Sequence, residues 1–151
     1  MLPTLCFDLD GTVADLYNVH GWLEALQAEN ATPYYNAAER YDLDYLNDLL
    51  ELYKACGGHI VVLTWLAKGG LSEGFKRASS AAKVLWLREN LPAITDVRTL
   101  DYGTQKWACV QNVKNAILFD DEPLNRVQWS RQGGKAYTPG RMFQTIERLL
   151  K

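Results

Sequence analysis

Two aspartates stand at alternate positions near the start of the chain, in the run Asp8-Leu9-Asp10-Gly11-Thr12. A carboxylate such as that of Asp8 can attack phosphorus and form an aspartyl-phosphate, which divides one difficult displacement into two easier ones. Asp10 can protonate the leaving oxygen and then take a proton from the attacking water. Gly11 allows the backbone to turn sharply after the acids. The run therefore predicts phosphoryl transfer, with Asp8 as nucleophile and Asp10 as acid and base.

A second acidic pair, Asp120-Asp121, follows an apolar run late in the chain. A phosphate held beside several carboxylates is repelled unless a cation lies between them, and hard oxygen ligands suit Mg²⁺. We expect Asp8 and Asp120 to supply carboxylate ligands, and Asp121 to bind the ion through water or to orient its shell. The predicted cofactor is therefore Mg²⁺, which would also offset charge that develops in the transition state.

A hydroxyl and a lysine would complete such a site. Thr64 follows an apolar run and can donate a hydrogen bond to a phosphoryl oxygen. Lys106 is our choice for the lysine that neutralises phosphate charge, and Lys83 is the alternative. Trp65 directly follows Thr64 and is the first candidate for a wall of the substrate site. The predicted substrate-binding residues are thus Thr64, Trp65 and Lys106.

Aromatic residues are frequent in the first third of the chain, and we expect most of them to pack within the protein while some stack on a nucleobase. They are Tyr17, Trp22, Tyr34, Tyr35, Tyr41 and Tyr45. Three cations, Lys68, Lys76 and Arg77, could contact a second phosphate, although solvated surface is the default expectation for each.

Short apolar runs precede these polar residues and are typical of buried strands. They cover residues 4–7, 60–63 and 116–119, with weaker runs at 97–100 and 135–137. Helical patterns separate them: one covers 43–53 after a candidate N-cap at Asp42, a second covers 78–86 and a third covers 142–150. This alternation predicts an α/β protein, a Rossmann-like three-layer sandwich with a mostly parallel sheet. In such sheets ligands bind beyond the carboxyl ends of the strands, where the candidate residues lie.

Residues 13–58 are long for a single crossover between strands. We expect two helices in this stretch, joined by residues 30–41, and no linker or low-complexity region sets it apart. The predicted organisation is one domain, residues 1–151, with a small helical cap insert at about 13–58.

Composition excludes several classes of protein. A chain of 151 residues with net charge −2 has no broad basic surface for a nucleic-acid backbone. The first apolar run is interrupted by Asp8, and no later run approaches the length of a membrane span, so we expect a soluble, cytoplasmic protein with no membrane partner. The three cysteines are widely separated and lack the spacing of metal ligands, as do His20 and His59, which favours reduced thiols and structural histidines.

The residues Phe7-Asp8-Leu9-Asp10-Gly11-Thr12, Thr64, Lys106 and Asp120-Asp121 resemble the four ordered motifs of the haloacid dehalogenase-like hydrolase superfamily. The resemblance spans nearly the whole chain. It implies the Rossmann-like fold, the aspartyl-phosphate route, Mg²⁺ and a metal bond from the Asp10 backbone carbonyl. The second acid is similar to the phosphatase branch. The insert, the helix that contains Lys83 and the Asp120-Asp121-Glu122 sequence resemble the deoxyribonucleotidase group.

The predicted function is a Mg²⁺-dependent phosphohydrolase that acts on a small phosphomonoester, with a nucleoside monophosphate as one candidate. The terminal phosphate of a nucleic-acid strand is an alternative substrate, which the acidic chain disfavours. A different class is a non-catalytic phosphate-binding or phosphoacceptor regulator. Receiver modules of that class carry the acceptor aspartate on a middle strand after an acidic pair, whereas here the Asp8 run comes first. Asp8 and Asp10 together also favour turnover.

Overall fold

The computed structural model describes residues 1–151 and contains a five-stranded sheet in which all neighbouring strands are parallel. The strand order is β5-β4-β1-β6-β7, so β1 is central. The strands are β1 (Thr4–Phe7), β4 (Ile60–Trp65), β5 (Asp96–Leu100), β6 (Ala116–Phe119) and β7 (Lys135–Tyr137). All five predicted strands are confirmed. Strand β4 is longer than predicted, because Thr64 and Trp65 continue its pairing with β5.

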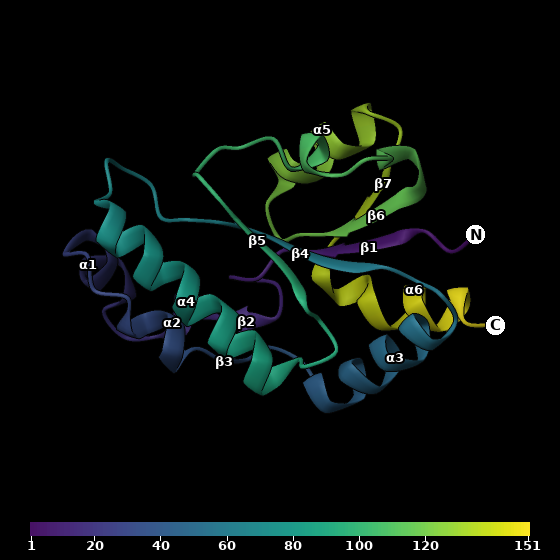
Figure 1. Ribbon diagram of the computed structural model, residues 1–151, viewed down its shortest axis with the longest axis horizontal. Coiled ribbons are helices and arrows are strands. Elements are labelled where there is room, and N and C mark those ends of the chain that lie inside the picture. Colours follow the sequence, from purple (N-terminus) through teal and green to yellow (C-terminus); the bar gives the residue numbers. More distant parts are fainter.

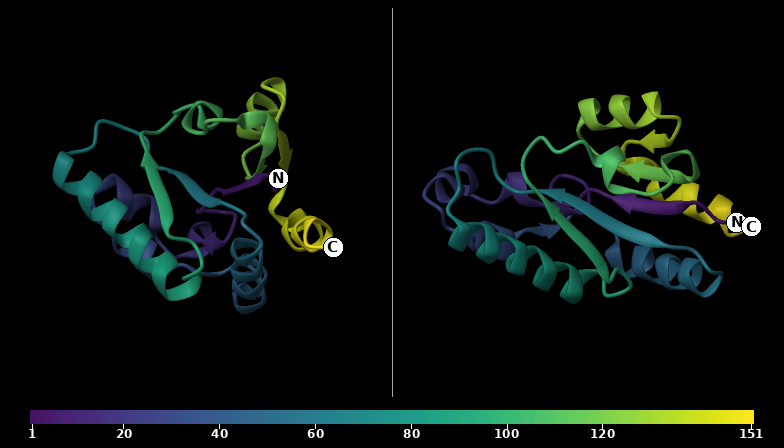
Figure 2. Two further views of the ribbon diagram at one scale, coloured as in Figure 1. Left: turned by 45° about the vertical axis from the view of Figure 1, so that its right-hand side comes forward. Right: turned by 45° about the horizontal axis from the view of Figure 1, so that its top comes forward.

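Helices cover both faces of the sheet and give the predicted three layers (Figures 1 and 2). Helix α5 lies on one face, and α3, α4 and α6 lie on the other. Their bounds are α3 (Leu43–Ala55), α4 (Glu73–Asn90), α5 (Pro123–Arg131) and α6 (Met142–Leu149), with short 3-10 helices η2 (Lys106–Cys109), η3 (Val113–Asn115) and η4 (Pro139–Arg141). The fold is therefore the predicted Rossmann-like α/β type.

Alternation along the strands divides the apolar side chains between two cores. Leu5 and Phe7 of β1 join the larger core, which includes α3, α4 and α6. Cys6 points to the opposite face and packs in a smaller core with Trp129 of α5. Because β1 is buried on both faces, its sequence reads as a continuous apolar run, as parallel strands do.

Side-chain caps fix the starts of the two longest helices. The Asp42 carboxylate accepts a hydrogen bond from the Tyr45 amide at 3.0 Å, so the predicted cap of α3 is confirmed. The Ser72 hydroxyl accepts from the Phe75 amide at 3.2 Å at the start of α4. Each cap satisfies a backbone amide that has no partner within its helix.

The chain between β1 and α3 forms a small subdomain next to α4. It contains β2 (Ala14–Asp15), η1 (Leu16–Asn18), α1 (Trp22–Gln27), α2 (Thr32–Asn36) and β3 (Ala38–Glu39), and β2 pairs antiparallel with β3. Helix α2 lies within the segment predicted to join only two helices, so residues 13–58 contain three α-helices. Leu16, Leu26 and Tyr34 pack with Phe75 and Ala82 of α4 in a third core. Helix α3 instead packs into the larger core against α6.

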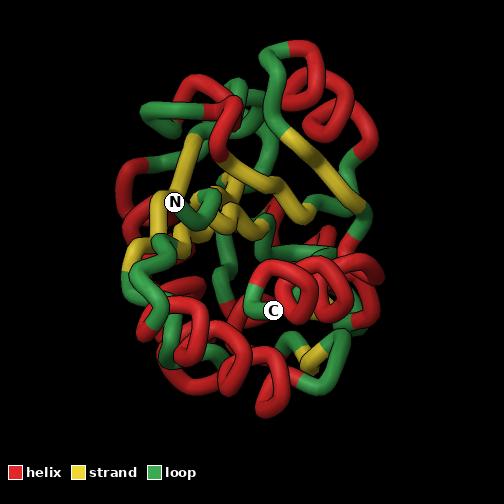
Figure 3. The backbone as a smooth tube through the Cα atoms, turned by 90° about the vertical axis from the view of Figure 1, so that its right-hand side faces the viewer, coloured by secondary structure: helices red, strands yellow, loops and turns green.

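The two ends of the sheet differ in what lies beside them. The carboxyl ends of the strands point toward α1 and α2, while both chain termini lie at the opposite end (Figures 1 and 2). Figure 3 looks from the end with the termini and shows the strands between helices. None of the helices is both long enough and apolar enough to traverse a bilayer.

Candidate active site

Asp8 is held at the carboxyl end of the central strand by bonds on both sides. Its amide donates to the Phe119 carbonyl of β6 at 2.9 Å, and its carboxylate accepts from the Thr12 hydroxyl at 3.0 Å. The chain then reverses at once, because the amides of Thr12 and Val13 both donate to the Leu9 carbonyl. The strand and this turn together fix the position of the carboxylate.

Gly11 makes that turn possible. Its φ of +83° lies in the left-handed region, which favours glycine. A Cβ atom here would lie 2.3 Å from Asp121 Oδ2 and 2.7 Å from the Tyr17 ring. The Gly11 carbonyl accepts a hydrogen bond from the Arg40 guanidinium, which ties the turn to the end of the subdomain. The sharp turn predicted for Gly11 is therefore present.

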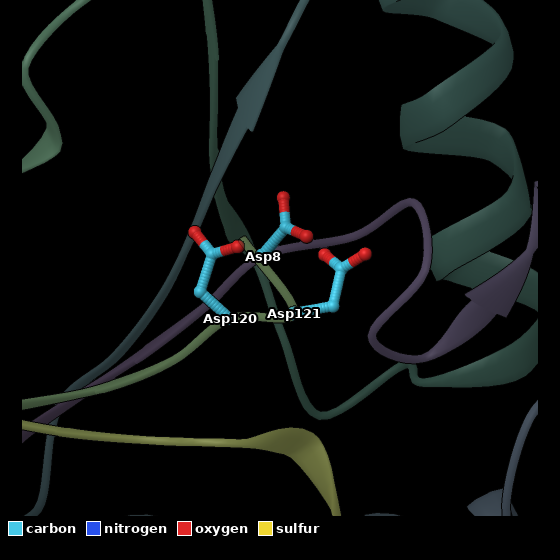
Figure 4. A group of neighbouring side chains, drawn as sticks. All are labelled: Asp8, Asp120 and Asp121. Carbon is cyan, nitrogen blue, oxygen red and sulfur yellow. The ribbon is translucent and has the colours of Figure 1, made fainter. Parts of the chain in front are cut away.

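Three carboxylates meet at this edge of the sheet. Asp8, Asp120 and Asp121 each place one oxygen within 4.8 Å of the others. Figure 4 shows Asp8 rising from the end of β1 and the other two from the segment after β6, with all three carboxylates on the same side. The carboxylate of Asp10 is not in this group. It pairs instead with Lys83, and a metal contact from its backbone carbonyl stays a prediction.

Crowding and burial change the acidity of these groups. Burial raises the pKa of Asp121 to about 8, together with a hydrogen bond to Asp8 and the charges of Asp8 and Asp120. Burial and the charge of Asp8 raise the pKa of Asp120 to about 6. Burial opposes ionisation of Asp8 too, but the nearby Lys106 ammonium and the hydrogen bonds outweigh it and lower the pKa. The surroundings therefore favour the ionised form of Asp8 and disfavour that of Asp121.

The donor set fits a divalent cation. Oxygen ligands alone, with more negative than positive charge nearby, suit Mg²⁺ better than a softer metal. Asn125 adds an independent observation: its amide nitrogen donates to Asp120 Oδ2 at 3.0 Å, but its buried oxygen has no hydrogen-bond donor in the protein. Such an acceptor suits a water of a hydrated ion. The carboxylates that would hold the ion are those of Asp8, Asp120 and Asp121.

Lys106 lies between two of these acids. Its ammonium donates to Asp8 Oδ1 at 2.9 Å and to Asp120 Oδ2 at 2.8 Å, and the residue is 2% exposed. Burial opposes its charge, but the two carboxylates outweigh burial and raise the pKa of Lys106. An ammonium has three donors, so one remains for a further acceptor.

Lys83 occupies the other side of the site and is fully buried. Its ammonium donates to Asp10 Oδ2 at 2.7 Å, to Thr64 Oγ1 at 2.8 Å and to the Trp65 carbonyl at 2.7 Å. The Tyr34 ring lies 4.7 Å from the same nitrogen. All three donors of Lys83 are used, whereas Lys106 keeps one. This count favours Lys106, the lysine chosen from the sequence, for contact with a phosphate.

One cavity of about 660 Å³ collects the candidate residues. All seven residues predicted for the site line it: Asp8, Asp10, Thr64, Trp65, Lys106, Asp120 and Asp121. Lys83 lies behind the lining. The volume is within the usual range for a small-molecule pocket. The roles of these residues stay predictions, but they share one pocket at the carboxyl ends of the strands.

Two solved structures resemble this chain over nearly its whole length, although no family model and no curated protein matches the sequence. One is an uncharacterized protein from Corynebacterium glutamicum, with a TM-score of 0.56 at 17% identity, covering 99% of this chain and 96% of that one. The other is D,D-heptose 1,7-bisphosphate phosphatase from Burkholderia thailandensis, with a TM-score of 0.58 at 12% identity, covering 97% of this chain and 84% of that one. At these identities the likeness establishes the fold alone.

Trp65 contributes to the cavity wall at the end of β4. Its indole nitrogen donates to the Thr104 carbonyl at 2.9 Å, and its ring lies 5.0 Å from that of Tyr102. The Lys106 ammonium is 5.6 Å from the Trp65 ring, so the wall adjoins the acids. This position is the one predicted for a substrate wall.

The six aromatic residues of the first third divide into two groups. Tyr17, Trp22 and Tyr34 line the cavity, whereas Tyr35, Tyr41 and Tyr45 do not. Of the three candidate cations for a second phosphate, only Lys68 lines it, and Lys76 instead pairs with Glu73 and Asp101. The pocket therefore has little positive charge outside the site around Asp8.

The structure brings to the site two residues that were not predicted for it, and a third that was named only as an alternative. Asn125 was not among the predicted site residues, yet its amide nitrogen donates to Asp120. Tyr102 follows β5, so its position at the carboxyl end of a strand could have identified it. Lys83 was named only as an alternative. It lies among buried Ser79, Ala82 and Trp86 of α4, and a lysine on an apolar stripe is the signal that indicates a buried role.

Proposed function

We propose that this protein is a Mg²⁺-dependent phosphomonoesterase of the haloacid dehalogenase-like superfamily that works through an aspartyl-phosphate on Asp8. The observation that carries the proposal is the convergence of seven predicted residues, from three strand ends and one 3-10 helix, on a single cavity. The fold that the chain shares with a protein described as a phosphatase supports it.

Asp8 and Asp10 divide the chemistry between them. An Asp8 oxygen bonds to phosphorus while the bond from phosphorus to the leaving oxygen breaks, and Asp10 gives its proton to that oxygen. A water oxygen then bonds to phosphorus, the bond to Asp8 breaks, and Asp10 takes a proton from the water. Inorganic phosphate is released and both acids return to their starting states.

Thr64 and Lys106 bind the phosphoryl group. The only hydrogen bond of the Thr64 hydroxyl is the one it accepts from Lys83, so its own proton is free for a phosphoryl oxygen. Lys106 has one unused donor and lines the cavity. A Mg²⁺ ion held by Asp8, Asp120 and Asp121 would screen the phosphate from the carboxylates and offset developing charge.

The cavity favours a small phosphomonoester, with a nucleoside monophosphate as one candidate. Its volume of about 660 Å³ suits a ligand of that size. The end of a nucleic-acid strand is disfavoured, because Lys68 and Lys106 are the only cations that line the cavity and the chain has a net charge of −2.

Phosphate release from a generic aryl phosphate and from nucleoside monophosphates, with and without Mg²⁺, tests the proposal. We expect Mg²⁺-dependent turnover that Asp8→Asn abolishes, because an amide is not a competent nucleophile. Asp48→Asn is the matched control, since Asp48 is an exposed aspartate on α3 outside the cavity. Folded native protein that releases no phosphate from any substrate would contradict the enzymatic function. A stable phosphoryl group on Asp8 without release would indicate a phosphoacceptor regulator instead.

A further inference from the structure

Two aromatic pairs from different elements form part of the cavity wall beside the acids. Tyr17 and Trp22 belong to the small subdomain, and their rings pack edge to face with centroids 5.0 Å apart. Trp65 and Tyr102 belong to β4 and the loop after β5, with ring centroids also 5.0 Å apart. All four line the same cavity. Aromatic faces offer a large, rigid contact area to another flat ring.

Several of these apolar side chains are exposed, although burial would be favourable. Tyr17 is 50% exposed, Leu23 46% and Tyr102 53%, and all three line the cavity. They are three of the ten large exposed apolar side chains in the protein. A polar ligand would gain little from such a lining, whereas an aromatic one would bury apolar surface against it.

The charges of the lining restrict the ligand further. Outside the catalytic centre, Lys68 is the only cation that lines the cavity, and the same lining contains two acids, Glu29 and Glu122. A second phosphate would therefore find only one lysine to offset its charge.

Most of the free polar groups in the remaining lining are on aromatic side chains. Glu29 already accepts from the Ser72 amide at 3.0 Å, and Glu122 caps α5 through the Leu124 amide at 3.1 Å. Outside the catalytic centre, the lining side chains whose polar groups make no hydrogen bond within the protein are Gln27, Lys68 and the aromatic residues Tyr17, Trp22, Tyr34 and Tyr102. A flat ring can pack on the aromatic faces themselves, whereas a polyol would place its hydroxyls against apolar surface.

From these observations we infer that the site selects phosphomonoesters with one phosphate and a flat, uncharged aromatic group on the leaving side, against polyol phosphates and bisphosphates. This inference rests on the proposed function. Aryl phosphates and nucleoside monophosphates share the selected chemistry, and the two aromatic pairs are the walls that recognise it.

A matched panel of substrates tests the selection. kcat/KM is measured for an aryl phosphate, a nucleoside monophosphate, a hexose monophosphate and a nucleoside bisphosphate. We expect the first two to exceed the others by at least about tenfold, the ratio that one aromatic contact of about 1.4 kcal/mol produces. Faster turnover of the hexose phosphate or the bisphosphate overturns the inference but leaves the phosphatase function intact. Loss of all turnover would contradict the proposed function itself.

Two tyrosines of similar exposure, one inside the cavity and one outside it, test whether the aromatic wall recognises the substrate ring. Tyr102→Ala removes a tyrosine that is 53% exposed and lines the cavity, and Tyr35→Ala removes one that is 49% exposed and does not. We expect Tyr102→Ala to raise KM for the aromatic substrates about tenfold, with no change for the hexose phosphate. Tyr35→Ala should not change KM for either class of substrate. Equal effects of Tyr102→Ala on KM for aromatic and hexose substrates would show that the Trp65–Tyr102 pair does not recognise rings.

A second inference comes from the buried lysine on α4. Lys83 donates to Asp10, to Thr64 and to the Trp65 carbonyl, and no donor is left for a ligand. Because Thr64 Oγ accepts from Lys83, the proton of that hydroxyl must point to another side. Thr64 is fully buried yet lines the cavity, and no protein acceptor takes its proton. The geometry points to Lys83 as a positioning residue that turns the Thr64 hydroxyl toward the phosphoryl group.

A double-mutant cycle with Lys83→Met and Thr64→Val separates positioning from simple structural support. If Lys83 acts through Thr64, each single variant should weaken inhibition by inorganic phosphate, and the double variant should be about as weak as Thr64→Val alone. This role would be contradicted if the double variant lost phosphate affinity by the product of the two single losses. Lys54→Met is the control, because its ammonium donates to the Ala93 carbonyl and lies outside the cavity.

Lys83→Met leaves Asp10 without its partner, and loss of a buried ion-pair partner lowers stability. Lys83→Gln keeps a hydrogen-bond donor and provides the second test, with thermal unfolding measured for every variant. Lys83→Gln should recover part of the phosphate affinity that Lys83→Met loses. Equal phosphate affinity in native protein and in both folded Lys83 variants overturns the inference.

Discussion

The edge of the sheet and the small subdomain above it build the same cavity by different means. At the sheet edge, Asp8 and Asp120 are placed by neighbouring parallel strands whose register is fixed, with Phe7 opposite Phe119. In the subdomain, Trp22 and Tyr34 are placed by short helices of six and five residues that depend on packing against α4. Helices this short are not stable alone. The proposed catalytic residues therefore lie on the sheet edge, whereas one of the two proposed aromatic walls, Tyr17 and Trp22, lies on the region that depends on packing.

The largest effect we expect comes from a change at the sheet edge. Asp120→Asn should lower kcat/KM on the order of 10³-fold and weaken the apparent affinity for Mg²⁺, because it removes a charged ligand and the partner of Lys106. Thermal unfolding should change little, since the variant also relieves repulsion between Asp120 and Asp8. Activity and a Mg²⁺ titration measure the first effect. A large fall in stability with unchanged Mg²⁺ affinity would remove the distinction between the two regions.

A change in the packing of the subdomain on α4 should have the opposite effect, a large loss of stability with a smaller loss of kcat. Phe75→Ala should destabilise the protein by about 3 kcal/mol, because Phe75 is 4% exposed and packs with Leu26 and Tyr34 in the subdomain core. It should also raise KM, while kcat on saturating substrate changes less. Leu87→Ala on the same helix is the control, since Leu87 is 1% exposed in the main core. It should destabilise the protein similarly without the rise in KM, as measured by denaturant unfolding and steady-state kinetics.

Gly11 lies where the two regions meet, so its replacement should affect both. Gly11→Ala should cost about 2 kcal/mol, because the left-handed backbone and the contact with Asp121 Oδ2 both disfavour a Cβ atom. Since Asp121 and Tyr17 would have to move, we expect lower kcat and higher KM together. Gly57→Ala provides the control: Gly57 has φ +88° but open space around its Cβ position, so it should lose stability without loss of activity.

The sequence predicted the sheet edge better than the subdomain, for physical reasons. Apolar runs in the sequence indicate strands. A polar residue at the end of such a run lies at the common edge of a parallel sheet, and this rule placed Asp8, Thr64 and Asp120 together. Within the subdomain, neighbours differ in ways that periodicity does not reveal. Tyr34 is buried and lines the cavity, whereas Tyr35 is exposed and does not.

Contacts between distant parts of the chain explain what else was not predicted. The bond from Lys83 to Asp10 joins residues 73 positions apart, and it depends on how α4 crosses the sheet. The sequence analysis chose Lys106 for one role and kept Lys83 as the alternative, because the sequence does not show that two lysines reach the same site. The structure places both lysines at the site, with different partners.

The smallest effect we expect concerns the start of α4, where the subdomain and the helix share a hydrogen-bond network. Ser72→Ala removes the oxygen that accepts from the Phe75 amide, which should cost about 1 kcal/mol. The Ser72 amide would still donate to Glu29, so the contact with the subdomain remains.

Glu29→Gln keeps the Ser72 cap but weakens that contact and removes an acid from the cavity lining. If the subdomain determines recognition, Glu29→Gln should change KM more than Ser72→Ala does, even though Ser72→Ala lowers the unfolding free energy more. The reverse order in both measurements would show that recognition depends on the stability of α4 rather than on the subdomain.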